Sequence, residues 1–363
     1  MQTDSSRPVR TTAMLVAVFL CWFYSLTASA DTTFPGDFFL FPDVKIDYIS
    51  NGLQPGEDSV EYQPEIDLFY SYKKGSLLAL VEYFLNKDEN EFERLQIGWT
   101  DNKNTTAWLG RFHNPLGYWN MAQHHGIYLQ TSISRPSIAE FADDGGIMPM
   151  HITGALFEVE AALDGGTNLV FDIALGASPT MENGELQPVD IWRYGATKSH
   201  ENLTLRVRYI PDFINDTQLG LFTGYTRMEG DGVSTDEIKQ TQAGAFGVWD
   251  NNTIKLLGSV FFIDTTLTLP GNAESDGNFV SGYLQAEYAI DNRFTLYGRI
   301  EDTSDVKSDP YLALFPLFVE SREMVGLRYD VIRNHAFTLE VKNDQMASRD
   351  VTHIVLQWSA LLP

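Results

Sequence analysis

From about residue 44 to its end, this sequence of 363 residues repeats one pattern. Runs of roughly ten residues, in which apolar and polar side chains alternate, are separated in turn by a very short connection and a longer polar one. Alternation with a period of two predicts β-strands that have one apolar and one polar face. Antiparallel strands bring successive connections to opposite rims, so short turns that alternate with long loops are typical of a closed barrel that crosses a membrane.

The connections predict the number of strands. Short turns rich in Asn, Asp and Gly, which tolerate the left-handed backbone of tight hairpins, occur at residues 73–75, 101–104, 164–166, 211–215, 250–252, 291–292 and 333–334. The longer loops between them are residues 52–61, 86–91, 113–150, 177–201, 228–237, 265–278, 304–321 and 343–349. Seven turns and eight loops predict sixteen strands, provided that residues 190–199 belong to the fourth loop rather than to an extra strand.

The fold class that we predict is all-β: a sixteen-stranded antiparallel transmembrane barrel over residues 44–363, with short periplasmic turns and long extracellular loops. In residues 203–210, for example, Leu203 and Leu205 should face lipid while Thr204 and Arg206 face inward. A soluble sandwich or propeller would also show alternation and turns. It would not explain the one-sided loop lengths or the aromatic residues near strand ends, which suit the two membrane interfaces.

The first 43 residues are expected to lie outside the barrel. Arg7 and Arg10 precede an apolar stretch of about 15 residues, and Ala28-Ser29-Ala30 follows it, which is the pattern of a signal peptide over residues 1–30. The alternative is a membrane anchor helix, but that needs about 20 apolar residues. Residues 31–43 would then form an N-terminal periplasmic segment.

The composition excludes several classes of protein. The formal net charge of −24 disfavours nucleic acid as a partner. The single cysteine, Cys21, lies in the predicted signal peptide, so disulfide bonds would not hold the exported chain. Neither a phosphate-binding loop nor a serine-hydrolase or zinc-protease motif is present, and we expect a protein that is not an enzyme and needs no cofactor.

The loop at residues 113–150 is far longer than an ordinary hairpin connection, and loops of this length are usually functional or disordered. Its many apolar and aromatic residues indicate that it packs against something, and the interior of the barrel is the available place. The loop contains Glu140, Asp143 and Asp144 within the stretch Ala-Glu-Phe-Ala-Asp-Asp-Gly-Gly.

Sixteen strands, an acidic chain and this long loop after the fifth strand resemble the general-diffusion porins of Gram-negative outer membranes. The acidic stretch is similar to that family's Pro-Glu-Phe-Gly-Gly segment, although it lacks the proline and inserts Ala-Asp-Asp before the glycines. The resemblance implies that the third loop folds inward and narrows the pore, with Glu140, Asp143 and Asp144 at the constriction. It also implies a homotrimer.

Alternation places a set of arginines on the inner wall, where the resemblance implies a basic ladder opposite the loop: Arg94, Arg111, Arg206, Arg208, Arg299 and Arg328. A guanidinium is always charged and suits a fixed positive wall. The alternative is that these arginines pair with lumenal acids, such as Glu287, Glu301 and Asp330, and merely fill the interior. Both interpretations stay open at this point.

Four histidines lie in or beside the loop: His113, His124, His125 and His151. With nearby acids they could bind Zn²⁺, Cu²⁺ or Ni²⁺. The other interpretation is that they pack the loop and donate hydrogen bonds to backbone carbonyls.

The sequence therefore predicts a passive, cation-leaning outer-membrane channel for small hydrophilic solutes and ions, surrounded by lipid and lipopolysaccharide. A channel specific for a metal ion or a small organic solute is the first alternative. A closed barrel that acts as an adhesin or receptor is the second.

Overall fold

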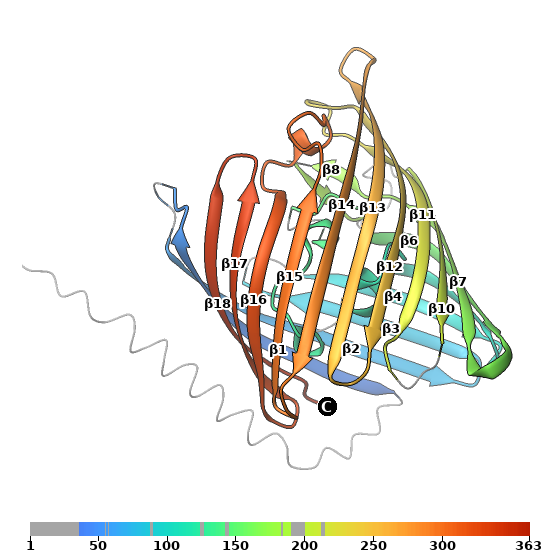
Figure 1. Ribbon diagram of the computed structural model, residues 1–363. Coiled ribbons are helices and arrows are strands. Elements are labelled where there is room, and N and C mark those ends of the chain that lie inside the picture. The colour runs from blue at the N-terminus through green and yellow to red at the C-terminus, as the bar shows by residue number, and fades with distance from the viewer. Residues whose placement is uncertain are drawn as a thin grey trace, which may run out of the picture. The chain divides into compact units, whose positions relative to one another are not determined.

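The computed structural model describes residues 36–54, 56, 58–87, 90–123, 127–141, 145–182, 184–189, 200–211 and 215–363. Within them, sixteen antiparallel strands close into one barrel, as the sequence predicts (Figure 1). The predicted signal peptide, residues 1–30, lies outside the described residues. No helix among the described residues is long and apolar enough to cross a membrane.

The first eight barrel strands are β1 (Asp37–Asn51), β2 (Val60–Lys74), β3 (Leu77–Leu85), β4 (Asn90–Thr100), β5 (Thr105–His113), β6 (His151–Ala162), β7 (Asn168–Ala177) and β10 (Glu201–Ile210). The other eight are β11 (Gln218–Glu229), β12 (Glu237–Asp250), β13 (Ile254–Leu269), β14 (Ala273–Ala289), β15 (Phe294–Thr303), β16 (Val319–Ile332), β17 (His335–Met346) and β18 (Asp350–Ala360). Each strand pairs with its neighbours in the chain, and β1 pairs with β18 to close the barrel.

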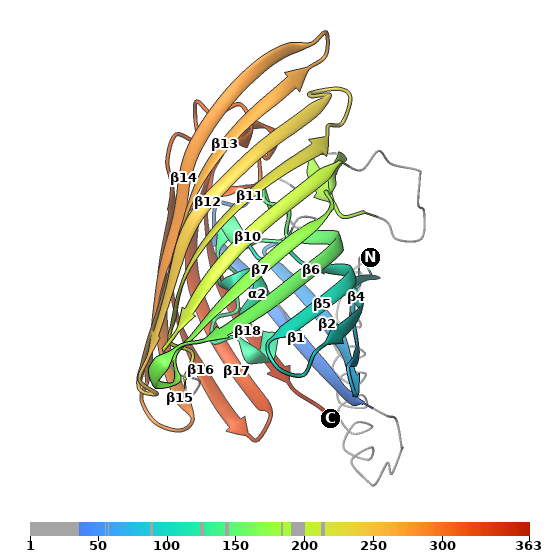
Figure 2. The same ribbon diagram turned by 90° about the vertical axis from the view of Figure 1, so that its right-hand side faces the viewer.

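All seven predicted short turns join strands at the predicted places. The chain ends at the rim that carries these turns, where the Leu361 amide donates to the Asn334 carbonyl of the β16–β17 turn at 3.0 Å (Figures 1 and 2). β7 and β10 pair directly with each other, so residues 190–199, which lie outside the described residues, are not needed as a barrel strand.

Two strand boundaries differ from the prediction. β1 begins at Asp37 instead of residue 44, and Asp37 to Asp43 pair with β2, so only part of the predicted periplasmic segment lies before the barrel. The predicted loop at residues 265–278 is mostly strand, because β13 and β14 stay paired up to Leu269 and Ala273. Asn272 adopts a φ of 65° in the turn that joins them.

The loops at the other rim carry short elements. The third loop contains α2 (Trp119–Ala122), η1 (Ile127–Leu129) and η2 (Ser137–Ala139). The fourth contains the hairpin of β8 (Thr180–Glu182) and β9 (Glu185–Gln187), and the loop before β16 contains η4 (Leu312–Leu314). A further turn, η3 (Asp164–Gly166), joins β6 to β7.

The two faces of the strands have opposite character, as predicted. On β10, Leu203 is 40% exposed and Leu205 is 41% exposed on the outer face, while Thr204 is fully buried and Arg206 is 4% exposed on the inner face. β14 and β15 alternate in the same way. A continuous outward band of exposed Leu, Val, Ile, Phe and Tyr side chains would be costly in water and suits the hydrocarbon of a bilayer.

Candidate functional site

The third loop lies inside the barrel. Its residues bond to inward-facing side chains of strands that are widely separated around the wall, among them Arg206 on β10, Glu287 on β14 and Glu340 on β17. A loop that met all three strands from outside would have to cross the apolar outer face. The predicted inward fold is therefore present, and the elements of the loop are visible within the barrel in Figure 1.

The first polar anchor of the loop is on β10. Arg206 donates from Nε to Asp172 of β7 at 2.7 Å and from Nη1 to the Gly117 carbonyl at 3.1 Å. Gly117 has a φ of +75°, in the left-handed region that glycine adopts without steric cost. Arg206 is therefore bound both to the wall and to the loop.

A second anchor is a row of charges on β15, β16 and β17. Arg299 donates to Glu301 at 2.8 Å and to the Ser134 carbonyl at 2.9 Å. Arg322 donates to Asp344 at 2.6 Å and to the Arg135 carbonyl at 2.7 Å.

The carboxylate of Glu301 also accepts from the Ser137 amide of the loop at 2.6 Å. Hydrogen bonds to charged groups stabilise by about 1.5–3 kcal/mol each. This row of charges therefore fixes the middle of the loop to the wall.

Glu340 and Arg328 hold the stretch between η1 and η2. Glu340 of β17 is fully buried and accepts hydrogen bonds from the amides of Ile133 at 3.1 Å and Ser134 at 3.3 Å. Arg328 of β16 donates to the Tyr128 carbonyl at 2.7 Å and also to the Gln130 carbonyl. The loop is thus held by its backbone along the inner wall from β10 to β17.

An apolar cluster shares this side of the interior. It joins the third loop to the inner wall of β11–β14 and to the two other structured loops: Leu116, Tyr118, Trp119, Ile138, Ile147 and Met148 from the third loop; Met181 and Leu186 from β8 and β9; Phe222, Phe246, Phe261, Phe279 and Tyr283 from the wall; Tyr311, Leu312, Phe315 and Phe318 from the loop before β16. Burying one such side chain contributes about 1.5–3 kcal/mol. The cluster fills part of the lumen and leaves less room for water.

Hydrogen bonds also hold the loop before β16 against this cluster. The hydroxyl of Tyr311 donates to the Ile147 carbonyl at 2.6 Å, and burial raises the pKa of this hydroxyl, which keeps it a neutral donor. The Asp309 carboxylate accepts from the amides of Tyr311 and Leu312 at 2.9 and 3.0 Å. Burial raises the pKa of Asp309 above its usual value.

Of the predicted constriction acids, Glu140 is described, whereas Asp143 and Asp144 lie outside the described residues. Glu140 directly follows η2 and has Arg135 of the same loop as a charged neighbour, at 3.9 Å. The Arg135 guanidinium lies over the Phe141 ring, 3.8 Å from its centre. Glu140 therefore has a basic neighbour within its own loop.

The predicted arginines do face inward, but each has an acidic partner. Arg94 pairs with Glu82 at 2.6 Å, Arg111 with Glu91 at 2.9 Å, and Arg328 with Asp330 at 2.9 Å. Arg206 and Arg208 share Asp172, and Arg299 pairs with Glu301. The wall is therefore a set of ion pairs, and some of its arginines also bind the loop. Two of the acidic partners, Glu301 and Asp330, are among the acids named in the alternative to a bare basic ladder.

The structure brings His113 and His151 together and adds an acid that the sequence did not single out. His113 ends β5, His151 begins β6, and the two residues are paired in register. Glu93 of β4 lies 2.7 Å from the Nε2 atom of His151. His124 and His125 lie outside the described residues.

Several residues that hold the loop were not found from the sequence. Arg322 lies on β16 and Glu340 on β17, two strands whose apolar and polar residues alternate. Arginine and glutamate also occupy many other positions that face the lumen. The signal that could have pointed to them is their inward parity, since Glu340 shares the inner face of β17 with Thr338. Parity alone does not say which inward residue meets the loop.

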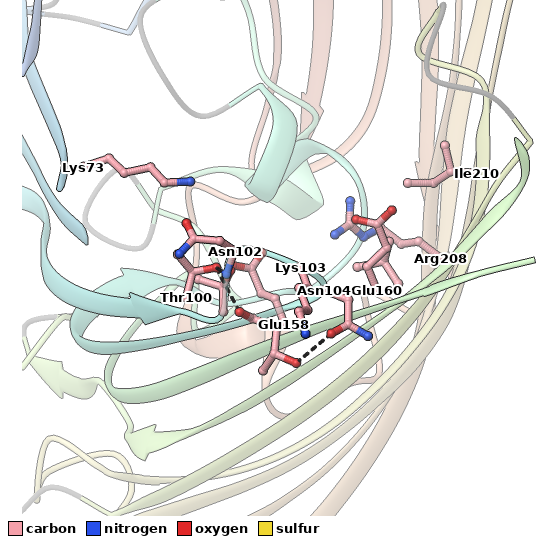
Figure 3. Close-up of a pocket in the computed structure, with 12 residues that line it drawn as sticks. Lys73, Thr100, Asn102, Lys103, Asn104, Glu158, Glu160, Arg208 and Ile210 are labelled. Atoms are coloured by element: carbon pink, nitrogen blue, oxygen red, sulfur yellow. Dashed lines mark hydrogen bonds between the residues drawn. The ribbon is translucent and has the colours of Figure 1, made fainter. Parts of the chain in front are cut away.

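Two of the cavities lined by the described residues lie at the end of the lumen that carries the short turns. One, of about 420 Å³, is lined by both signs of charge, among them Lys73, Lys103, Glu158, Glu160 and Arg208. Figure 3 shows Lys73 of β2 on one side of this cavity and Arg208 of β10 on the other. The second cavity, of about 290 Å³, includes Lys255, Glu287 and Arg328 and reaches Thr131 of the third loop.

A closed barrel of sixteen antiparallel strands with an apolar outer face, a charged interior and an inward-folded loop defines the class of membrane-spanning porin-like barrels. Solved structures have this fold. The anion-selective porin from Comamonas acidovorans matches with a TM-score of 0.58 and 14% identity over 90% of this chain and 99% of that one. The outer membrane channel DcaP of Acinetobacter baumannii matches with a TM-score of 0.59 and 10% identity over 90% and 97%.

A third similar structure is OmpT, an outer membrane protein of Vibrio cholerae, in its trimer form, with a TM-score of 0.54 and 10% identity over 89% of this chain and 98% of that one. No protein-family model matches the chain. A search of the curated proteins also gives no match. The chain thus has the sixteen-stranded fold of the Gram-negative outer-membrane porins.

Proposed function

We propose that this protein is a passive channel of the Gram-negative outer membrane that admits small hydrophilic solutes and ions, with the third loop as its constriction. The observation that carries the proposal is the third loop itself, which runs inside a closed barrel and is fixed to the inner wall through Arg206, Arg299, Arg322, Arg328 and Glu340. A loop fixed in this way narrows the lumen without a conformational change.

A lean towards cations is the finer part of the proposal. The chain carries a formal net charge of −24, and the predicted constriction acids are Glu140, Asp143 and Asp144. The arginines on the wall are paired with acids, so they add less positive potential than a bare ladder would. Since one similar protein is an anion-selective porin, the fold itself does not determine charge selectivity.

The experiment is a bilayer recording of the purified chain across a salt gradient. Neutralising the three loop acids together (Glu140→Gln, Asp143→Asn, Asp144→Asn) should lower the ratio of cation to anion permeability, read from the reversal potential. The matched control neutralises three acids outside the loop: Glu274→Gln, Asp276→Asn and Asp350→Asn. An unchanged reversal potential in the loop variant would overturn the assignment of the constriction.

A second candidate function is a narrow, substrate-specific channel. The apolar cluster between the third loop, the wall of β11–β14 and the loop before β16 favours it, because this cluster occupies space that a wide pore would leave to water. The single-channel step separates the candidates. A large ohmic step supports general diffusion, a small step blocked by one solute supports specificity, and no step supports a receptor or adhesin.

The oligomer that we propose is a homotrimer, by analogy with the trimer form of the similar Vibrio cholerae protein. Native mass spectrometry of the protein in detergent would measure it. A single species with the mass of one chain would contradict the proposal.

A further inference from the structure

Three ionisable side chains converge where the third loop leaves and rejoins the wall. His113 is the last residue of β5, His151 is the first of β6, and their rings lie 5.2 Å apart between centres. Glu93 comes from the adjacent strand β4, with its Oε2 atom 2.7 Å from His151 Nε2. One ligand atom from each residue lies within 4.8 Å of the other two.

All three side chains are deeply buried: Glu93 is 6% exposed, His113 2% and His151 3%. Burying a carboxylate is costly unless a cation or hydrogen bonds compensate for it. A second buried acid, Glu82 of β3, lies 3.8 Å from His113 Nε2 and also pairs with Arg94. Among the described residues, two imidazoles and two carboxylates therefore lie close together at this point of the wall.

We infer that His113, His151 and Glu93 bind a divalent first-row transition metal ion, of which Zn²⁺ is the representative. Two imidazole nitrogens and one carboxylate oxygen form a ligand set that suits zinc, nickel and copper, whereas calcium and magnesium prefer oxygen ligands alone. Glu82, beside His113, orients that ring and balances the charge of the ion. Outer acids of this kind fix the orientation of ligating histidines.

The ligands come from β4, β5 and β6, and two of them flank the third loop. The ion would therefore tie together the two ends of the loop. The Phe141 ring is stacked on His151, with 6.5 Å between ring centres, which connects the site to the stretch that begins at Glu140. Metal binding is thus expected to stiffen the base of the constriction.

Titration calorimetry measures the heat with which the ion binds to the purified barrel. This measurement does not require conduction. The proposed metal site can therefore be refuted while the proposed channel function stands, and the channel function can be refuted while the metal site stands.

The test is titration of ZnCl₂ into the folded, full-length barrel in detergent after treatment with EDTA. We expect one saturable site per chain. A second titration uses Co²⁺ in place of Zn²⁺. The visible absorption of bound cobalt reports its coordination geometry. The absence of saturable binding, or a stoichiometry far below one, would overturn the inference.

Two conservative variants, Glu93→Gln and His151→Gln, identify the ligands. Each should weaken zinc binding by at least about 100-fold, since the loss of a mere outer partner already costs 10–100-fold. The matched control is His353→Gln, which removes a lumenal histidine of β18 that lies beside Asp47 of β1, three strands away from β4. Heat-modifiable migration on SDS gels confirms that each variant is a folded barrel.

A double variant at the two other histidines of the loop, His124→Gln with His125→Gln, completes the test. Binding retained in this variant and lost in His151→Gln supports the site. If the double variant loses zinc binding and His151→Gln retains it, the metal binds elsewhere in the loop and the inference is overturned.

Discussion

At the scale of single residues, Glu340 binds the third loop through both of its carboxylate oxygens. Besides the amides of Ile133 and Ser134, its carboxylate accepts the Ser134 hydroxyl at 2.5 Å and the Tyr297 hydroxyl at 2.9 Å. All four partners donate, which requires an acceptor with two oxygens and no hydrogen. An amide in its place would point an N–H₂ group at these donors.

Glu340→Gln should therefore lower the free energy of unfolding by about 1.5–3 kcal/mol, the range for hydrogen bonds to charged groups. Urea unfolding in detergent, followed by tryptophan fluorescence, measures the change. The control is Glu274→Gln at an exposed position of β14, for which a shift within about 0.5 kcal/mol is expected. Equal midpoints for the two variants would contradict the role of Glu340.

A second residue whose effect can be isolated is Asp101, in the turn between β4 and β5. Hydrogen bonds from the backbone amides of Thr105, Lys103 and Asn104 hold its pKa below the usual value. A carboxyl with a depressed folded-state pKa contributes stability above its unfolded pKa of about 3.9, and this contribution is lost as the pH falls through the folded value.

The melting temperature of the protein relative to Asp101→Asn should therefore fall as the pH drops from 5 to 2.5. Asn keeps an acceptor but has no charge to lose, so the difference isolates this one carboxyl. The measurement is a pair of thermal melts in detergent at each pH. A difference that does not vary with pH would refute the depressed pKa.

At the scale of elements, the third loop depends on the charged row of β15–β17. Arg299 is 2% exposed and donates to Gln285 at 2.9 Å and to the Ser132 hydroxyl at 3.3 Å, besides Glu301 and the Ser134 carbonyl. Removing one partner of a buried ion pair costs about 3–5 kcal/mol. Part of that cost falls on the contact between loop and wall.

Arg299→Gln should make the loop accessible to proteinase K in the otherwise folded barrel, with cleavage more than about tenfold faster, since each tenfold corresponds to only 1.4 kcal/mol. Mass spectrometry of the fragments locates the cuts within residues 113–150. Arg293→Gln, at an exposed position in the turn after β14, is the control. Cleavage at the same rate in both variants would show that Arg299 does not restrain the loop.

The elements also show what the sequence could and could not predict. All seven turns at the short-turn rim were predicted, because so short a connection needs Asn, Asp or Gly at particular backbone angles. The upper half of the β13–β14 hairpin was missed. Successive residues of β14 there, such as Glu274, Ser275 and Asp276, are all polar, so the alternation of apolar and polar residues is absent although the strands stay paired.

The same reasoning separates the parts of the candidate site. Inward parity predicted that Arg206, Arg299 and Arg328 face the lumen, because an arginine on the lipid side is costly. Which carbonyl each arginine binds depends on the path of a 38-residue loop that has no periodic pattern, and local sequence does not determine that path. Glu93 was missed because it is near the histidines only across strands.

At the scale of the whole molecule, the outer face determines how the barrel sits in a bilayer. Leu221 and Leu219 on β11 are both 60% exposed, but Leu219 lies two residues nearer to the short-turn rim. An arginine near the bilayer midplane costs about 2–4 kcal/mol, and near the interface about 0–1 kcal/mol.

Leu221→Arg should therefore destabilise the barrel in lipid vesicles by more than Leu219→Arg does. Equilibrium unfolding in guanidinium chloride from vesicles gives both values. Equal free-energy costs at the two positions would mean that the centre of the apolar band is not nearer to Leu221 than to Leu219.

The height of the barrel wall varies around its circumference. β13 and β14 reach 16 and 17 residues and rise above the rest of the wall, whereas β3 and β5 have 9 residues each (Figures 1 and 2). At about 3.3 Å per residue, a nine-residue strand measures roughly 30 Å along its own axis, and its tilt shortens the height that it covers. The additional length of β13 and β14 is the polar upper part of their hairpin, which includes Glu274 and Asp276, so it lies beyond the apolar band and does not widen it. The uneven rim therefore gives the β13–β14 hairpin a polar outer surface past the lipid, open to molecules on that side of the membrane.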